Sequence, residues 1–456
     1  MSNSKLPTGW VETELKNCFL YAKSGGTPST KNKNYYGGVI PFVKIDDISN
    51  GSKYLYDTNV KINSSGIRSS SSWIVPKNSL VYSMYASYGI PIINKKRVAT
   101  SQAMINMIFT KDFHIDYIYY YLLDFKSKLS SYTKGTTQAN LNAGIVNLLP
   151  IKVPPLNEQK RIVTKIEKLF SNLDNSDKYL AYLEKQLKRY RQSVLKSAFE
   201  GELTREWRIK HKINFEWTNK EVRDIIQLVD GDRGKNYPKK SDYLDAGYCL
   251  YLSTKNVRPF GFLFDDEVYI SKEKHEQLRS GTLSKGDIVL TTRGTIGNVA
   301  FYDETIPYKV VRINSGMLIL RIKEDVKLNP TYLMKYIQSP DFEKQRKEKV
   351  TGTAQPQLPG GTLKDFIVSV PNTLEEQNEI VNEIDKHFSI IDKLESVVQK
   401  SIQESKRLRQ SILKQAFEGK LVEQDPNDES AEMLLEKIAK AKEEYTKEMS
   451  KRKKKQ

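Results

Sequence analysis

The sequence predicts an α+β protein in which two mixed α/β domains are separated by two long antiparallel coiled-coil helices, with an internal repeat that gives pseudo-two-fold symmetry. Three observations lead to this prediction. The segment Gln192–Gly201 recurs 218 residues later as Gln410–Gly419. An apolar spacing typical of coiled coils precedes each copy. Residues 10–155 and 215–372 are rich in Tyr, Ile, Val, Ser and Gly, with short apolar runs broken by turn residues.

The first α/β domain is predicted over residues 6–155 and the second over residues 206–372. The segment Pro76–Ser83 ends in an apolar run with the character of a strand, and Ser284–Thr291 is a weaker echo of it. Around residues 116–129 the apolar residues have helical spacing. Few other residues are identical, so we expect two related domains whose side chains have diverged.

Long helices are predicted over residues 156–205 and 373–422. In the first helix the apolar residues recur in alternating steps of four and three, which is the spacing of a coiled-coil seam. Each helix lacks a partner unless the two helices pack on each other, so we expect an antiparallel pair. The seam predicted for the second copy consists of Ile380, Ile384, Ile391, Leu394, Val398, Leu408 and Ile412.

Residues 423–456 are predicted to form a last amphipathic helix and a basic tail. The tail contributes to a formal net charge of +18 over 456 residues. A surplus of this size lowers the energy of approaching a polyanion, and nucleic acid is the usual one. If the partner is nucleic acid, two diverged domains predict two different half-sites, at a spacing set by the helices.

Cysteine and histidine usage argues against a disulfide framework and against a metal site. Cys18 and Cys249 are the two cysteines, and the four histidines are scattered along the chain. The start of the chain is polar, and no apolar run reaches the length of a membrane span. We therefore expect no metal, no cofactor bound by this chain and a cytoplasmic location.

The order of domains and the repeated motifs resemble the specificity subunits of Type I restriction–modification enzymes. Pro154–Gln159 has the Pro-Pro-Leu-x-Glu-Gln pattern that opens the first helix in that family. Its second copy, Pro371–Gln377, has one extra residue and lacks the second proline. The helix ending at Gly201, repeated at Gly419, is equally typical. The resemblance covers essentially residues 6–440.

This resemblance implies a subunit without catalytic activity that reads a bipartite, asymmetric target in double-stranded DNA, one half per α/β domain. It implies two methyltransferase subunits and motor-nuclease subunits as partners, and no membrane. S-adenosylmethionine, ATP and Mg would be bound by those partners, which methylate adenine N6 or cleave DNA. In agreement, the sequence lacks the Asn/Asp-Pro-Pro-Tyr/Phe tetrapeptide of adenine methyltransferases.

The first candidates for DNA contact are two aligned loops, Tyr85–Gly89 and Arg293–Asn298. Their small residues allow close approach of the backbone to phosphate, and Ser, Thr and Asn donate to phosphates or base edges. The Arg293 guanidinium can bind guanine with two hydrogen bonds in the major groove. The alternative is an ordinary hairpin turn with an exposed arginine.

The second pair of candidate loops is 134–138 and 351–355, for which a hinge between domain and helix is the alternative. Lys44 and Lys255, beside acidic residues and Asn256, come third and can equally be surface charge. The candidate DNA-binding residues are Lys44, Tyr85, Ser87, Tyr88, Lys134, Thr136, Gln138, Lys255, Asn256, Arg293, Thr295, Asn298, Thr353 and Gln355.

Methyltransferase subunits are expected to dock on outward-facing residues near the helix ends. A solvated flank of the coiled coil is the alternative for each of them. The candidate residues are Arg189, Arg191, Lys196, Phe199, Arg407, Arg409, Lys414 and Phe417.

Two other functions stay open from the sequence. One is a scaffold whose α/β domains bind protein or RNA, which leaves the basic surplus and the diverged duplicate domains unexplained. The other is a specificity unit of a related system that lacks the nuclease partner.

Overall fold

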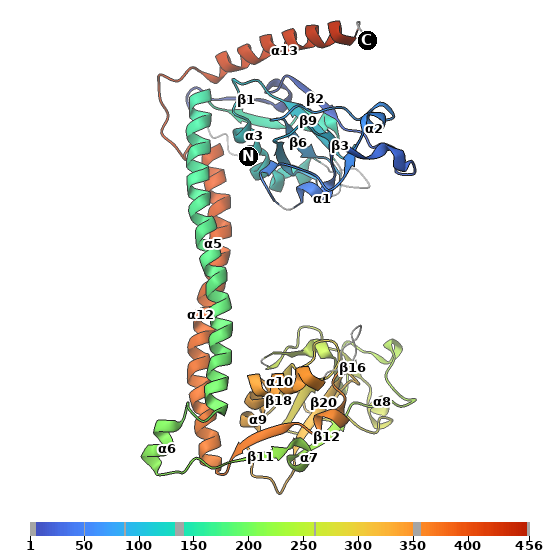
Figure 1. The fold of residues 1–456 in the computed structure, drawn as a ribbon, viewed down its shortest axis with the longest axis vertical. Helices are drawn as coiled ribbons and strands as arrows, with labels where there is room; N and C mark the ends of the chain where they lie inside the picture. The colour runs from blue at the N-terminus through green and yellow to red at the C-terminus, as the bar shows by residue number, and fades with distance from the viewer. Residues whose placement is uncertain are drawn as a thin grey trace. The chain divides into compact units, whose positions relative to one another are not determined.

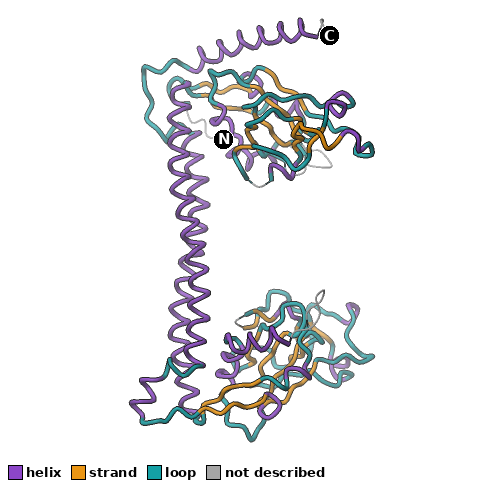
Figure 2. Tube along the Cα trace, in the orientation of Figure 1, coloured by secondary structure: helices purple, strands orange, loops and turns teal. Residues whose placement is uncertain are grey.

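The computed structural model describes residues 6–49, 51–85, 88–132, 141–259, 261–349 and 357–453. The chain divides into two compact units, unit 1 (Met1–Tyr179 and Ser401–Gln456) and unit 2 (Leu180–Lys400). Two 44-residue helices, α5 (Leu156–Phe199) and α12 (Leu374–Phe417), contribute residues to both units (Figure 1). Each unit holds one α/β domain, in which helices flank the strands (Figure 2). The predicted mixed α/β class is confirmed.

The α/β domain of unit 1 contains a five-stranded sheet with the order β2-β9-β6-β7-β4 and a three-stranded sheet with the order β5-β3-β8. In the central strand β6, Leu80 and Tyr82 face one apolar core and Val81 faces another. Because successive side chains of a strand point to opposite faces, a strand covered on both faces reads as a continuous apolar run. The strands and helices are β1 (Val11–Glu14), β2 (Tyr21–Ser24), β3 (Tyr36–Val43), α1 (Ile45–Ile48), β4 (Tyr54–Leu55), β5 (Lys61–Ile62), α2 (Ser64–Arg68), β6 (Leu80–Ser83), β7 (Pro91–Asn94), β8 (Ala99–Thr100), β9 (Met104–Ile108), α3 (Ile115–Phe125), α4 (Ala143–Asn147), β10 (Pro150–Val153) and α13 (Ala431–Lys453).

The α/β domain of unit 2 contains a four-stranded sheet with the order β12-β20-β17-β18 and a three-stranded sheet with the order β16-β13-β19. Its central strand β17 follows the same rule, with Ile288 and Leu290 in one core and Val289 in the other. The elements are α6 (Arg205–His211), β11 (Trp217–Glu221), α7 (Val222–Ile225), β12 (Ile226–Asp230), β13 (Cys249–Leu252), β14 (Val257–Arg258), β15 (Gly261–Phe262), β16 (Tyr269–Ile270), α8 (Lys272–Glu276), β17 (Asp287–Thr291), β18 (Val299–Tyr302), β19 (Val311–Ile313), β20 (Met317–Ile322), α9 (Pro330–Ile337), α10 (Pro340–Lys349), α11 (Gly360–Leu363) and β21 (Ile367–Pro371).

The two domains repeat one strand topology. Strands β2, β9, β6 and β7 have the order and the antiparallel pairing of β12, β20, β17 and β18. The parallel pair β3–β8 corresponds to β13–β19. The register agrees as well, since Ser83 lies opposite Met104 and Thr291 lies opposite Met317. Thus the weak sequence echo before Ser83 and Thr291 marks equivalent central strands.

A buried glutamine joins each domain to the start of its long helix. In unit 1 the Gln159 amide accepts from the His114 backbone N–H at the start of α3 (3.0 Å) and donates to the Pro154 carbonyl (2.9 Å). In unit 2 the Gln377 amide accepts from the Asn329 backbone N–H (2.8 Å) and donates to the carbonyl of Pro371 (3.1 Å). An amide that both donates and accepts satisfies a helix start and a strand end together.

Ion pairs between α5 and α12 also recur at the repeat distance. In unit 1, Arg409 of α12 contacts Asp174 (2.7 Å) and Asp177 (2.8 Å) of α5. In unit 2, Arg191 of α5 contacts Asp392 (2.5 Å) and Glu395 (3.2 Å) of α12. Each arginine also lies over a phenylalanine of the other helix, Phe170 in unit 1 and Phe388 in unit 2. Thus α12 supplies the arginine and α5 the acidic residues in unit 1, and the reverse holds in unit 2.

The buried seam of α12 is narrower than predicted. Ile391 is 0% exposed and Val398 is 5% exposed, seven residues apart. In contrast, Leu394 is 48% and Leu408 is 51% exposed, so their assignment to the buried seam is wrong. A helix that packs along one stripe buries one side only, and both leucines lie beside that stripe.

The predicted C-terminal helix is α13, and it belongs to the core of unit 1. Its buried face includes Leu434 and Ile438, and the Ala431 N–H donates to the Gly9 carbonyl. Further along, the Lys442 ammonium donates to the Lys16 carbonyl at 2.7 Å. Within the described ranges, none of the helices combines the length and apolar character needed to cross a membrane.

We predict that Phe199→Ala lowers the free energy of unfolding of unit 2 by about 3–5 kcal/mol, because it removes a buried ring and leaves a cavity. The Phe199 ring packs edge-on against Tyr332 (5.3 Å between centroids) and Tyr336 (5.0 Å). Denaturant unfolding followed by circular dichroism measures this loss. Ile390→Ala, at a site that is 56% exposed, is the matched control, with a change within about 0.5 kcal/mol. Equal effects of the two variants would contradict the packing.

Candidate functional site

In each unit, one end of the paired sheets gathers the loops that the sequence analysis selects. In unit 1, β2 and β6 end where β9 begins, because Ser24 pairs with Ile105 and Ser83 with Met104. Strand β8 ends at Thr100, and its connection leads directly into β9. Since β3 runs parallel to β8, β3 also ends on this side. We call this surface the loop end of the domain. Unit 2 has an equivalent loop end where β12, β13 and β17 finish and β20 begins.

The loops after the central strands, 83–90 and 291–298, have the same backbone hydrogen bonds. The Gly89 N–H donates to the Ser83 carbonyl at 3.0 Å, and the Gly297 N–H donates to the Thr291 carbonyl at 3.0 Å. Both glycines have positive φ angles, +80° and +96°, which glycine adopts without a steric penalty. The side-chain oxygens of Ser83 and Thr291 each accept from the N–H seven residues later. The predicted alignment of these loops is therefore reproduced in three dimensions.

The side chains of these loops differ in what they offer to a ligand. Arg293 and Thr295 are exposed, and Tyr85 is 38% exposed. Tyr88 is half-buried against the core of unit 1. The Asn298 amide donates to the Val257 carbonyl at 3.0 Å, which ties it to its own domain. In addition, Ser87 lies outside the described residues.

The described segments that follow the second pair of candidate loops lie at the same loop ends. The loop residues Lys134, Thr136, Gln138, Thr353 and Gln355 lie outside the described residues. The chain after each loop is anchored, because the Leu141 N–H donates to the Met84 carbonyl and the Leu358 N–H donates to the Thr292 carbonyl. Gln357 also forms a backbone bridge with Arg293. Both chain segments are thus attached directly beside the first pair of loops.

The third pair of candidates follows β3 and β13, at the same loop ends. Lys44 is half-buried, and its N–H donates to the Asp47 carboxylate at 2.8 Å. The Lys255 side chain is 75% exposed and lies 3.6 Å from the Asp266 carboxylate. Asn256, in contrast, is 3% exposed and bonds the turn around it, including the Asp266 carbonyl. The structure gives Asn256 a scaffolding role instead of the predicted role in contacting DNA.

Sequence reasoning missed a charged turn at the loop end of unit 2. Asp232 follows β12 and is 6% exposed. Its carboxylate accepts from the backbone N–H groups of Gly234 (2.6 Å) and Arg279 (2.7 Å), and the Arg279 guanidinium lies 3.4 Å away. Burial alone raises the pKa of the Asp232 carboxyl, but these donors outweigh it and lower the pKa from 3.8 to about 2. The signal in the sequence was the Gly-Asp-Arg-Gly turn after an apolar strand.

The predicted docking residues divide into exposed and buried ones. Arg189, Lys196, Arg407 and Lys414 are exposed. Arg191 and Phe199, both 5% exposed, are not outward-facing as predicted, and Phe417 is also 5% exposed. Phe417 packs against Tyr117 and Tyr121, as Phe199 packs against two tyrosines of α9. Arg409 is occupied by its two aspartates. The two phenylalanines hold the domains to the helices and the two arginines hold the helices to each other, which corrects the prediction of a surface role for these four residues.

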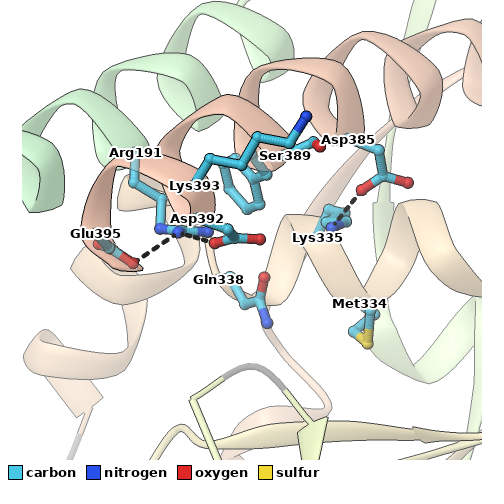
Figure 3. Close-up of a pocket in the computed structure, with 10 residues that line it drawn as sticks. Arg191, Met334, Lys335, Gln338, Asp385, Ser389, Asp392, Lys393 and Glu395 are labelled. Atoms are coloured by element: carbon cyan, nitrogen blue, oxygen red, sulfur yellow. Dashed lines mark hydrogen bonds and ion pairs between the residues drawn. The ribbon is translucent and has the colours of Figure 1, made fainter. Parts of the chain in front are cut away.

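A cavity of about 440 Å³ lies between α9 and α12 in unit 2 (Figure 3). Two of its cationic side chains already have anionic partners, since Arg191 contacts Asp392 and Lys335 contacts Asp385 at 2.7 Å. The cavity therefore belongs to the junction of the domain with the helix. In the part of the chain that the structure describes, no group of three or more His, Cys, Asp or Glu side chains is placed to hold a metal ion.

Comparison with known families gives one matching model. The family is described as the Type I restriction modification DNA specificity domain, and it matches residues 7–185 and 214–404. Each match takes in one α/β domain and part of the following long helix. Together the two matches cover most of the chain.

Comparison with known proteins gives relatives of similar length. The chain is 26% identical to the Type I restriction enzyme EcoBI specificity subunit of Escherichia coli, over 94% of this chain and 91% of the relative. It is 25% identical to the EcoKI specificity subunit of Escherichia coli K12, over 96% of both chains. It is also 24% identical to the MjaIX specificity subunit of Methanocaldococcus jannaschii, over 91% of this chain and 94% of the relative.

Two solved structures share the fold. One chain, from work on complex assembly and conformational transition of the type I R-M system, has a TM-score of 0.71 at 19% identity, and covers 91% of this chain and 100% of that chain. The HsdS subunit from Thermoanaerobacter tengcongensis has a TM-score of 0.53 at 18% identity, and covers 92% of this chain and 99% of that chain.

We predict that Asp232→Asn destabilises unit 2 by about 1–2 kcal/mol at pH 7, because the folded state lowers the pKa of this carboxyl. A lowered pKa stabilises the fold above the unfolded value and loses that contribution as the pH falls toward about 2. The difference between wild type and variant should therefore shrink to about half by pH 3. Denaturant unfolding at both pH values measures it. Asp230→Asn is the control, since this side chain is 58% exposed and its ion pair is weak. A pH-independent difference would contradict the assignment.

Proposed function

This chain belongs to the family of Type I restriction–modification DNA specificity subunits, and from that premise we propose that it reads a bipartite, asymmetric target in double-stranded DNA. One observation carries the proposal. Two domains with the same strands and the same loop hydrogen bonds present different side chains, such as Tyr85 and Arg293, at equivalent positions. Two domains with the same backbone but different exposed side chains are suited to two half-sites of different sequence.

The recognition domains are the segments 6–155 and 206–372, and the long helices space them as an antiparallel pair with a pseudo-two-fold axis. The exchange of roles between Arg191 and Arg409 supports this arrangement, because a two-fold axis maps each helix onto the other. A helical spacer is stiff, so it holds the two half-sites at a fixed separation.

The chemistry of the loop ends supports contact with DNA. The net charge of +18 favours binding to a polyanion and makes the affinity depend on salt. Exposed Arg293, Thr295 and Lys255 can donate to phosphates and base edges, while Gly294 permits close approach of the backbone. Residues 134–138 and 351–355 stay candidates for DNA contact, because the described chain after each of them is anchored at a loop end.

The chain acts as a non-catalytic, cytoplasmic scaffold for two methyltransferase subunits and for motor-nuclease subunits. S-adenosylmethionine, ATP and Mg are assigned to those partners. For methyltransferase docking we propose the exposed apolar residues of α12 in unit 2, Ile390 (56%), Leu394 (48%) and Val397 (60%). Their spacing of four and three places them on one side of the helix, next to the buried stripe. Exposed Arg189 and Lys196 extend the same proposal onto α5.

The target is tested by co-expressing the chain with the methyltransferase subunit encoded beside it, in a host free of adenine methylation. We expect N6-methyladenine at a two-part motif with a gap of constant length, mapped across the genome. An assembled complex that binds S-adenosylmethionine but methylates no such motif would refute the reading function and favour the scaffold that binds protein or RNA. A methylated motif without cleavage of unmodified DNA in the presence of every neighbouring subunit would favour the system without a nuclease.

The docking surface is tested by Val397→Asp, which places a charge in the proposed apolar contact. We expect at least about a tenfold loss of affinity for the methyltransferase subunit, measured by co-purification and titration, because a buried unpaired carboxylate is costly. The control is Ser396→Asp, which adds the same charge to the neighbouring exposed position, about 100° around the helix. Loss of binding in both variants, or in neither, would contradict docking at this stripe.

A further inference from the structure

Three positions at the loop ends carry arginine in unit 2 and a hydroxyl side chain in unit 1. The strand registers define the first two, because Ser24 and Asp230 lie opposite equivalent residues of β9 and β20, as do Ser83 and Thr291. Counting the same number of residues onward from these positions in the two domains gives the equivalent pairs. They are Thr27 with Arg233 and Tyr85 with Arg293.

The third position precedes Val75 and Leu283, whose N–H groups form equivalent backbone hydrogen bonds in the two units. The Val75 N–H donates to the Val98 carbonyl, and the Leu283 N–H donates to the Val311 carbonyl, at equivalent points of β8 and β19. Four residues before Val75 and Leu283 lie Ser71 and Arg279.

The neighbouring residues confirm that Ser71 and Arg279 occupy the same place. An added Cβ at Gly26 would lie 2.3 Å from the Ser71 hydroxyl, so the position of Gly26 touches that of Ser71. Its equivalent in unit 2 is Asp232, whose carboxylate accepts from the Arg279 N–H at 2.7 Å. In unit 2, Asp232 therefore holds the backbone of Arg279 in place. In unit 1, Gly26 at the equivalent position only leaves space for Ser71.

The three arginines lie on loops at the same loop end of unit 2, and we call them the arginine row (Arg279, Arg233 and Arg293). The Arg233 guanidinium donates to the Ser315 carbonyl at 3.3 Å, and the Arg293 N–H donates to the carbonyl of Gly316 at 3.2 Å. These anchors belong to consecutive residues, whose Cα atoms lie about 3.8 Å apart.

The guanidinium groups stay accessible. The side chain of Arg279 is 77% exposed and that of Arg233 is 49% exposed, and Arg293 is an exposed residue. The Arg279 guanidinium lies 3.4 Å from the Asp232 carboxylate, and the Arg233 guanidinium lies 3.4 Å from the Asp230 carboxylate. Asp232 is already held by two shorter bonds from backbone N–H groups, and the pair with Asp230 is solvated and weak. Both arginines can therefore exchange these contacts for a ligand.

We propose that the half-site read by unit 2 contains guanine, recognised by the arginine row, and that unit 1 reads its half-site without arginine at these positions. This inference rests on the proposed DNA-reading function. The planar guanidinium matches the N7 and O6 acceptors of guanine with two hydrogen bonds from a rigid fork, a geometry that the single ammonium of lysine and a hydroxyl group lack. The hydroxyl set consists of Thr27, Ser71 and Tyr85, which lack the charged, two-pronged donor of a guanidinium. A hydroxyl group can pair with a donor or with an acceptor on a base edge.

The test replaces each arginine by its unit 1 counterpart in the full methyltransferase complex, as Arg293→Tyr and Arg233→Thr, and by lysine in parallel. Genome-wide methylation and binding to base-substituted duplexes are measured. We expect discrimination for guanine at one or more positions of one half-site to fall by about 5- to 150-fold, with the other half-site unchanged. The lysine variants should lose discrimination too, because lysine keeps the charge but lacks the fork.

Lys364→Ser is the matched control, since it removes an exposed charge beside α7, at the opposite end of β12. Its specificity should equal that of wild type. If the arginine variants weaken binding to all sequences alike and reduce the salt slope by about 0.9 per residue, the arginines contact phosphate and the proposal is wrong. A half-site altered by these variants that holds no guanine also overturns it. If the wild-type complex methylates no bipartite motif, the DNA-reading function itself fails.

Discussion

The arrangement of each unit depends on one buried glutamine amide at the start of a long helix. Gln159 and Gln377 are 0% and 1% exposed, and each bonds both the start of a domain helix and the carbonyl at the end of a domain strand. Leaving either buried backbone group unpaired costs about 1–3 kcal/mol, so the amide fixes the domain on its helix. The loop end of the domain is thereby oriented with respect to the helix of the same unit.

Around each buried glutamine, the same aromatic and ionic contacts occur in both units. The two long helices exchange the residues that make these contacts. Phe199 and Phe417 fill the same kind of site between two tyrosines, and Arg191 and Arg409 hold the same pattern of acids. These residues lie in one sequence motif that occurs twice, so the motif is used for packing inside the chain. The close recurrence of the motif is then explained by buried geometry, which tolerates little change.

The loop ends follow the opposite rule. Their backbone hydrogen bonds agree between Ser83–Gly89 and Thr291–Gly297, while exposed Tyr85 of unit 1 occupies the position of exposed Arg293 in unit 2. A turn needs glycine and hydroxyl groups at set places, but it does not depend on the identity of the exposed side chains between them. Specificity can therefore change without a change in the scaffold. The hydroxyl set in unit 1 and the arginine row in unit 2 are two outcomes of that freedom.

The sequence by itself determined the repeat, the two α/β domains, the two long helices and the family, because periodicity and motif spacing are written along the chain. It also located the loops after β6 and β17. Only the tertiary structure decided that Arg191, Phe199 and Asn256 are inward, since the surfaces that bury them come from distant segments. The arginine row likewise joins residues from three separate loops, and no local pattern predicts which strand ends meet. Burial and proximity are properties of the packed chain, and a linear spacing does not contain them.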